Sequence, residues 1–205
     1  TVLIHAGRGV TQRDVQPLAN VLMKNGHELR ILSEGPELTA SIGGVQIVQQ
    51  PQRQPDEEVT ITGELTDVHG LLAVGVEKYN DEEIETINEF VADDGRIAGL
   101  TEPQDAFNPD DGATELQSSL GVFSRPGYVY NLEENDLNYQ RIFVEPRGTN
   151  SLVEGVDRAV FDTATPVGTG AGIEPLAPVG NAKLSTTRAG TDAAVLVRNG
   201  DTLLA

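Results

Sequence analysis

Nine residues of the types that bind ligands or transfer protons lie at or just after the ends of apolar segments. They are His5, Gly7, Arg8, Gly9, Gly75, Glu77, Thr101, Glu102 and Asp105. Each apolar segment before them is typical of a strand. Ligands on open α/β sheets bind beyond the carboxyl ends of the strands, where strand order reverses. We therefore interpret the nine residues as a candidate ligand-binding rim, and we assign none of them a catalytic role.

The Gly7-Arg8-Gly9 segment combines a flexible backbone with a guanidinium group. Such a group could hold the anionic part of a sugar or nucleotide ligand. The segment does not match the G-x-G-x-x-G dinucleotide fingerprint, because Thr11-Gln12 follow it. A plain connecting loop is the favoured interpretation.

The carboxylates Glu77, Glu102 and Asp105 could act as an acid and base pair or bind a hard cation if they converge. In a chain with 32 acidic residues, coincidence explains their positions at least as well. His5 is more simply a hydrogen-bonded structural histidine than a site residue. The acidic segment 105–115 lacks the spacing of a calcium-binding loop. The sequence therefore predicts neither a metal site nor a cofactor.

Residues 65–100 carry the clearest structural signals. The apolar run 69–75 predicts a strand that is covered on both faces. Asn80 and Glu83 have the spacing of a capping box, and Ile84, Ile87 and Val91, with Phe90 beside them, predict one buried helix face. Asp94-Gly95 ends the helix, and 96–100 resumes as a strand. This succession predicts a right-handed crossover unit.

A second crossover unit is predicted at the start of the chain. The segment 2–6 is an apolar strand, Asp14 caps a helix that Asn25-Gly26 ends, and 27–32 is the next strand. Weaker patterns indicate strands at 45–48 and 59–62, with an exposed loop at 49–58 between them.

The second half is rich in short strand patterns after a helix at 114–121. Strands are predicted at 128–130, 141–144, 158–161, 182–187, 193–198 and 202–204, and a loop at 165–180. Asn199-Gly200-Asp201 predicts a tight hairpin between the last two strands. We expect one α/β domain over 1–205, with a crossover half at 1–125 and a strand-rich half at 126–205. Because the sequence begins at Thr1 inside a strand pattern, we expect this domain to be excised from a longer protein.

The charge of the chain restricts its partners. It carries 32 acidic and 14 basic residues, a formal net charge of −18, and only three of the basic residues are lysines. This balance disfavours nucleic acid and anionic membranes as partners. Adaptation to high salt is favoured over an acidic surface for a cationic partner, so we expect a halophilic, haloarchaeal source. No apolar segment approaches the roughly 20 residues that span a bilayer, so we expect a soluble domain without direct membrane contact, in a cytoplasmic or extracytoplasmic compartment.

The succession from 2–6 through 71–75 and the capped helix to 94–100 resembles the class I glutamine amidotransferase-like superfamily. More narrowly, it is similar to an amidotransferase-like domain of prokaryotic proteins, some of them associated with gliding motility and transporters. The resemblance covers about the first 125 residues. It implies a flavodoxin-like parallel sheet flanked by helices, to which the second half adds antiparallel strands.

The same resemblance argues against glutamine hydrolysis. Amidotransferases place a nucleophilic cysteine just past the strand that corresponds here to 96–100. This chain has Thr101-Glu102 at that position and no cysteine anywhere. We therefore predict a non-catalytic binding or interaction module for a small molecule or a protein. The alternative is a hydrolase or other enzyme that uses the rim carboxylates, with or without a divalent cation.

Overall fold

The computed structural model divides the chain into two compact units, Thr1–Leu100 and Thr101–Ala205. We describe each unit by itself. The division falls after Leu100 rather than at residue 125, where the two predicted halves meet. The structure describes residues 1–7, 9–34, 60–76, 78–100, 112–147, 151, 153–168, 170–191 and 193–205. That the chain is a single domain of a longer protein stays a prediction.

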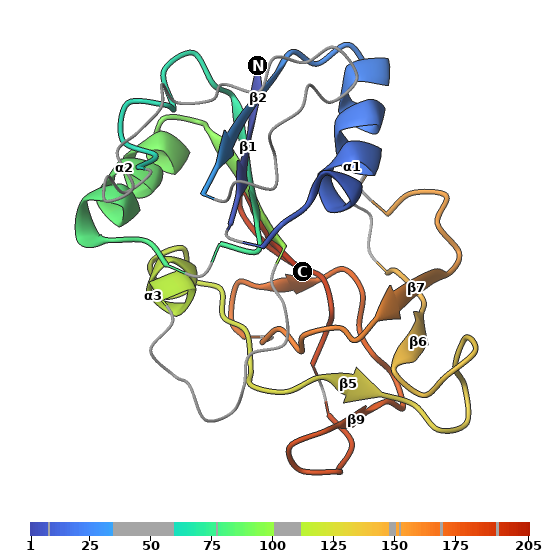
Figure 1. Ribbon diagram of the computed structural model, residues 1–205. Helices are drawn as coiled ribbons and strands as arrows, with labels where there is room; N and C mark the ends of the chain where they lie inside the picture. Colours follow the sequence, from blue (N-terminus) through green and yellow to red (C-terminus); the bar gives the residue numbers. More distant parts are fainter. Residues whose placement is uncertain are drawn as a thin grey trace. The chain divides into compact units, whose positions relative to one another are not determined.

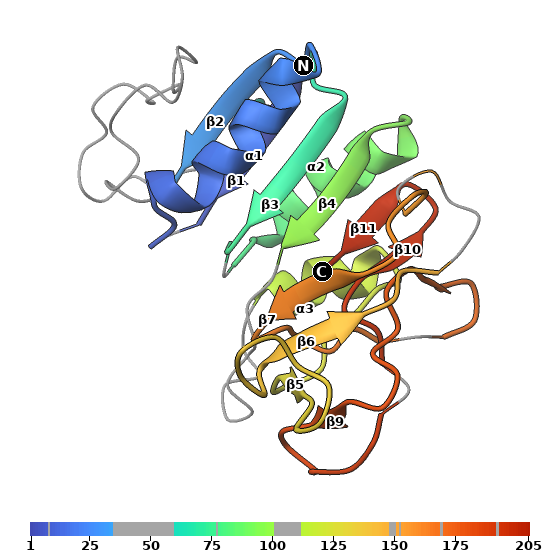
Figure 2. The same ribbon diagram turned by 90° about the vertical axis from the view of Figure 1, so that its right-hand side faces the viewer.

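Among its described residues, the first unit contains four parallel strands in the spatial order β2-β1-β3-β4 (Figure 2). Their bounds are β1 Val2–Ala6, β2 Leu29–Ser33, β3 Gly70–Val74 and β4 Arg96–Leu100. This is the order with which a flavodoxin-like sheet begins. The chain adds β2 on one side of β1 and β3 on the other, so strand order reverses between β1 and β3.

Two helices cover opposite faces of this sheet (Figure 1). They are α1 Gln12–Lys24 and α2 Asp81–Ala92. On the α1 face, Ile4 and Ala6 of β1 pack with Val15 and Ala19 in one fully buried cluster. Leu3, from the alternate face of β1, is also buried, at 1% exposed. A strand buried on both sides is typical of a parallel sheet between helix layers, and it confirms the interpretation of 2–6.

Helix α1 begins three residues earlier than the sequence predicts. Thr11 is its N-cap, and Asp14, which we expected to be the cap, lies in the first turn. The Asp14 carboxylate accepts hydrogen bonds from the Thr11 amide at 2.8 Å and from the Thr11 hydroxyl at 2.6 Å. These bonds hold the pKa of Asp14 below its ordinary value. The predicted end of the helix at Asn25-Gly26 is confirmed.

The predicted capping box of α2 is confirmed. Asn80 Oδ1 accepts from the Glu83 amide, and Glu83 Oε2 accepts from the Asn80 amide, both at 3.0 Å. Asp94 adopts φ +66° where the helix ends. The predicted buried face is only partly right: Ile87 is fully buried, whereas Ile84 is half-buried.

The described part of the second unit contains one helix, α3 Gly112–Ser119, and short antiparallel strands. The strands are β5 Val129–Tyr130, β6 Arg141–Val144, β7 Ala159–Asp162, β8 Glu174–Pro175, β9 Lys183–Leu184, β10 Val197–Asn199 and β11 Thr202–Leu204. They pair as β5 with β9, β6 with β7, and β10 with both β8 and β11. The predicted hairpin is confirmed, because Val197 pairs with Leu204 and Gly200 adopts φ +56° in the turn.

Several weaker predictions were wrong. Residues 60–62 form no strand, because the Ile61 amide binds the Glu83 carboxylate instead of a neighbouring strand. Only the end of 193–198 is a strand, and β8 lies inside the segment predicted as a loop. The predicted strand 45–48 and loop 49–58 lie outside the described residues.

The fold is therefore α/β, with a helix-flanked parallel sheet in the first half and antiparallel strands in the second. Among the described residues, no helix is both long and apolar enough to cross a membrane.

Candidate functional site

The glycine loops that follow β1 and β3 meet at the point where strand order reverses. The Gly7 amide donates to the Val74 carbonyl at 2.9 Å. A Cβ atom placed on Gly7 would lie 1.8 Å from the Gly75 carbonyl oxygen and 2.8 Å from the Val76 Cα. Only a residue without a side chain permits this contact between backbones. The structure therefore brings Gly7 and Gly75, which the sequence assigned to one rim, into contact, and ligand binding there stays a prediction.

Gly75 and Gly9 have backbone conformations that favour glycine. Their φ angles are +57° and +91°. The Gly75 amide donates to the Leu100 carbonyl at 3.1 Å, and this bond ties the loop after β3 to the end of β4. A Cβ on Gly75 would also lie 3.0 Å from the Val10 side chain. The rim is therefore held by backbone contacts between the ends of three strands.

His5 lies beneath this rim and is only 1% exposed. Its Nδ1 is 3.1 Å from the Tyr79 hydroxyl, and the two rings meet edge to face with centroids 5.5 Å apart. Its Nε2 is 3.2 Å from Glu34 Oε1. Nε2 and Oε1 are close enough for an ion pair. Their relative orientation does not meet the geometry of a hydrogen bond, so Nε2 has no hydrogen-bond partner. The imidazole is therefore enclosed between a phenol and a carboxylate.

The Tyr79 hydroxyl stays protonated in this setting. Burial raises its pKa strongly, and the nearby Glu34 and Glu83 carboxylates raise it further. A protonated phenol can donate a hydrogen bond to Nδ1 of His5 or accept one from it, depending on the imidazole tautomer. The three side chains therefore form a chain of polar contacts from the loop after β3, through β1, to the residue after β2.

The prediction that follows is that Tyr79→Phe destabilises the protein. The change removes the hydroxyl and leaves the buried His5 Nδ1 without its partner, which costs about 1–3 kcal/mol. We expect urea unfolding, followed by circular dichroism, to show a lower midpoint for this variant. Tyr139→Phe is the matched control, because Tyr139 is 45% exposed. Equal midpoints for both variants would contradict the role given to the Tyr79 hydroxyl.

Glu83 performs a second structural task beside the rim. It is 5% exposed, and its Oε1 accepts from the Ile61 amide at 3.1 Å while Oε2 caps α2. The carboxylate therefore joins the segment before β3 to the start of α2. The sequence indicated the cap but missed the bond to Ile61, and it missed Tyr79 and Glu34 entirely.

Five of the nine candidate residues lie outside the described residues. They are Arg8, Glu77, Thr101, Glu102 and Asp105. Convergence of the three carboxylates among them therefore stays a prediction. Within the described part of the chain, no three histidine, aspartate or glutamate side chains form a group that could hold a metal ion.

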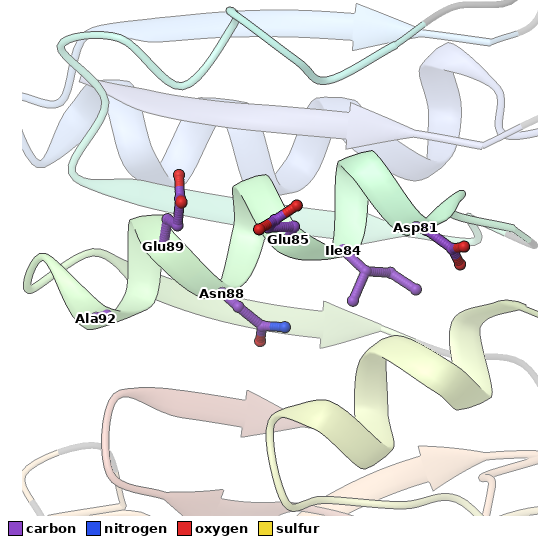
Figure 3. Close-up of a pocket in the computed structure, with 6 residues that line it drawn as sticks. All are labelled: Asp81, Ile84, Glu85, Asn88, Glu89 and Ala92. Atoms are coloured by element: carbon purple, nitrogen blue, oxygen red, sulfur yellow. The ribbon is translucent and has the colours of Figure 1, made fainter.

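Two hollows lie away from the rim, one in each unit. The first is a shallow depression along α2 (Figure 3), and its lining residues all belong to that helix. They are Asp81, Ile84, Glu85, Asn88, Glu89 and Ala92. The second is a more enclosed polar cavity of about 530 Å³ in the second unit, where the Arg158 guanidinium lies 4.0 Å over the Phe143 ring. The sequence did not predict either one.

Comparisons with known proteins support the fold. No protein-family model and no curated protein matches the chain. Among solved structures it is similar to an mmIFT52 N-terminal domain, with a TM-score of 0.69 and 11% identity over 100% of this chain and 84% of that one. It is also similar to a ThuA-like protein from Bacteroides uniformis ATCC 8492, with a TM-score of 0.52 and 12% identity over 99% of this chain and 79% of that one. At such identities the likeness concerns the fold alone.

Proposed function

We propose that the chain is a non-catalytic binding or interaction module on an amidotransferase-like scaffold. Its ligand, a small molecule or a segment of another protein, binds at the rim formed by the loops after β1 and β3. The rim lies at the reversal of strand order, where open α/β sheets bind ligands. The high net negative charge is, on this proposal, an adaptation to a halophilic setting.

One observation carries the non-catalytic part of the proposal. His5, the histidine beneath the rim, is buried and has a polar group beside each ring nitrogen. A general base must reach the proton that it abstracts from a substrate. An imidazole enclosed by Tyr79 and Glu34 serves the architecture instead. The chain also lacks the cysteine nucleophile of the amidotransferases.

A thermal-shift titration tests the proposal. The chain is titrated with phosphate, acidic sugars, nucleotides and divalent cations, one at a time. We expect one anionic class to stabilise the wild type, by about 2.7 kcal/mol at a ligand concentration of 100 times Kd. The stabilisation should be lost in Arg8→Ala and kept in Arg13→Ala, a matched change of an exposed arginine on α1.

Three outcomes would overturn the proposal. The first is that no compound in the panel stabilises the wild type, which would overturn a small-molecule ligand at the rim. The second is stabilisation that Arg8→Ala leaves unchanged. The third is turnover of an ester or amide substrate that disappears in Glu77→Gln, Glu102→Gln or Asp105→Asn, which would establish the enzyme that the sequence left as the alternative.

A further inference from the structure

The loop of residues 131–140 connects β5 to β6 (Figure 1). Three of its apolar or aromatic side chains are exposed to solvent. Leu137 is 89% exposed, Leu132 is 65% exposed and Tyr139 is 45% exposed. Leu137 has the highest exposed fraction of any large apolar side chain in the described part of the chain. Single exposed apolar residues are ordinary, but several gathered on one element mark an interaction site. We name this segment the Leu137 loop.

Hydrogen bonds hold the Leu137 loop in one conformation. The Asn131 amide donates to the Tyr139 carbonyl at 2.8 Å, which closes the loop. Asn131 Oδ1 accepts from the amides of Glu133 and Glu134, both at 3.0 Å. At the other end, Arg141 donates to Asp136 Oδ2 at 2.7 and 3.1 Å. A loop fixed before binding loses little conformational entropy when a partner docks.

Leu137 has a backbone conformation that a leucine rarely adopts. Its φ is +72°, in the left-handed region, where glycine or asparagine fits with less strain. Its side chain gains nothing from burial, because it is almost fully exposed. Neither the backbone nor the packing of this unit therefore favours leucine at this position. A strained, exposed apolar residue on a fixed loop points to a contact with another molecule.

The charge around the loop indicates the chemistry of that molecule. Residues 131–140 include three acids and no base, and Asp136 is already paired with Arg141. Glu133 and Glu134 are exposed and, together with Glu145, contribute carboxylates to the polar cavity of the second unit. The cavity also contains two guanidinium groups, but Arg147 lies 3.7 Å from Glu145 and Arg158 stacks on Phe143. In the described part of the chain no ion pair joins Glu133 or Glu134 to a basic side chain, so their carboxylates can meet a cationic group of another molecule.

We propose that the Leu137 loop docks into a partner protein, in an apolar pocket edged by lysine or arginine side chains. Leu137 enters the pocket, and Glu133 and Glu134 meet the basic edge. An anionic membrane surface would repel these carboxylates, and a second copy of a chain with net charge −18 would do the same. This surface lies in the second unit, and the proposal is independent of the rim in the first.

The test uses random peptides displayed on phage and selected on the full chain, with Leu137→Gly as the counter-selection target. We expect enriched peptides to combine apolar residues with lysine or arginine. Synthetic copies should bind Leu137→Gly about tenfold more weakly than the wild type. They should bind Glu133→Lys/Glu134→Lys more weakly as well. Val160→Ser is the matched control, because Val160 is exposed on β7 outside the loop, and binding to it should stay within about twofold.

Unfolding of the variant should not account for a loss of binding. Glycine adopts φ +72° with little strain, so Leu137→Gly should have a melting temperature no lower than that of the wild type. Three results would overturn the proposal. One is the absence of any peptide that distinguishes the wild type from Leu137→Gly. Another is co-sedimentation with phosphatidylcholine and phosphatidylglycerol vesicles that depends on Leu137. The last is a dimer, seen by light scattering after gel filtration, that Leu137→Gly abolishes.

Discussion

Gly7→Ala is expected to destabilise the first unit by about 3 kcal/mol or more, the upper end of what overpacking costs. The added methyl group would lie 1.8 Å from the Gly75 carbonyl oxygen and 2.5 Å from its carbon. Both atoms belong to the backbone, so no side chain can rotate to make room. The two loops must separate, and the hydrogen bond from the Gly7 amide to Val74 is then lost. Urea unfolding followed by circular dichroism measures the loss.

Gly190→Ala is the matched control for this change. A Cβ on Gly190 would meet no atom within 4 Å, and Gly190 does not adopt a positive φ. Its unfolding midpoint should equal that of the wild type. Equal midpoints for Gly7→Ala and Gly190→Ala would contradict the close contact between the loops after β1 and β3, on which the geometry of the rim depends.

Glu83→Ala is the second change with a large expected effect. It removes the acceptor for the Ile61 and Asn80 amides, and the Ile61 amide is buried. A buried donor without a partner costs about 1–3 kcal/mol, and the loss of the cap adds about 1 kcal/mol. We therefore expect a total loss of about 3 kcal/mol in the free energy of unfolding. Hydrogen exchange should show the Ile61 amide losing its protection.

Two further variants separate the causes of that loss. Glu82→Ala changes the neighbouring exposed carboxylate in the first turn of α2, and it should cost less than about 0.5 kcal/mol. Glu83→Gln keeps an acceptor oxygen but loses the charge, and it should fall between the wild type and Glu83→Ala. If Glu82→Ala lowered the free energy of unfolding as much as Glu83→Ala, the cause would be the charge of the first turn and not the hydrogen bonds that Glu83 accepts.

The elements that the sequence predicts well are those with local signals. The capping box of Asn80 and Glu83 lies within one helical turn, and the apolar runs at 2–6 and 69–75 predict two central strands. The parallel order of those strands follows from the crossover units. The fold class was therefore predictable from short segments.

The contacts that the sequence did not predict join distant residues. Tyr79 meets His5 across 74 positions of the chain, and Glu83 meets Ile61 across 22. No spacing rule connects such pairs. The false strand at 59–62 has the same cause, because a tertiary hydrogen bond took the Ile61 amide. The sequence did not predict the left-handed conformation of Leu137, because leucine rarely adopts that conformation.

In the proposed function, the rim and the buried polar side chains beneath it have different roles. Gly7, Gly9 and Gly75 shape the surface, whereas His5, Tyr79 and Glu34 hold the strand ends together from inside. The likeness to solved structures supports this architecture but assigns no ligand. The binding surface itself is therefore the central claim.

A titration followed by backbone amide chemical shifts tests that claim most directly. The protein is labelled with nitrogen-15, and the ligand is the compound that gives the largest thermal stabilisation. The account predicts that the largest shifts occur at Gly7, Gly9, Gly75 and Val76, with smaller changes at residues next to them. Shifts confined to the second unit, or to the hollow along α2, would contradict it.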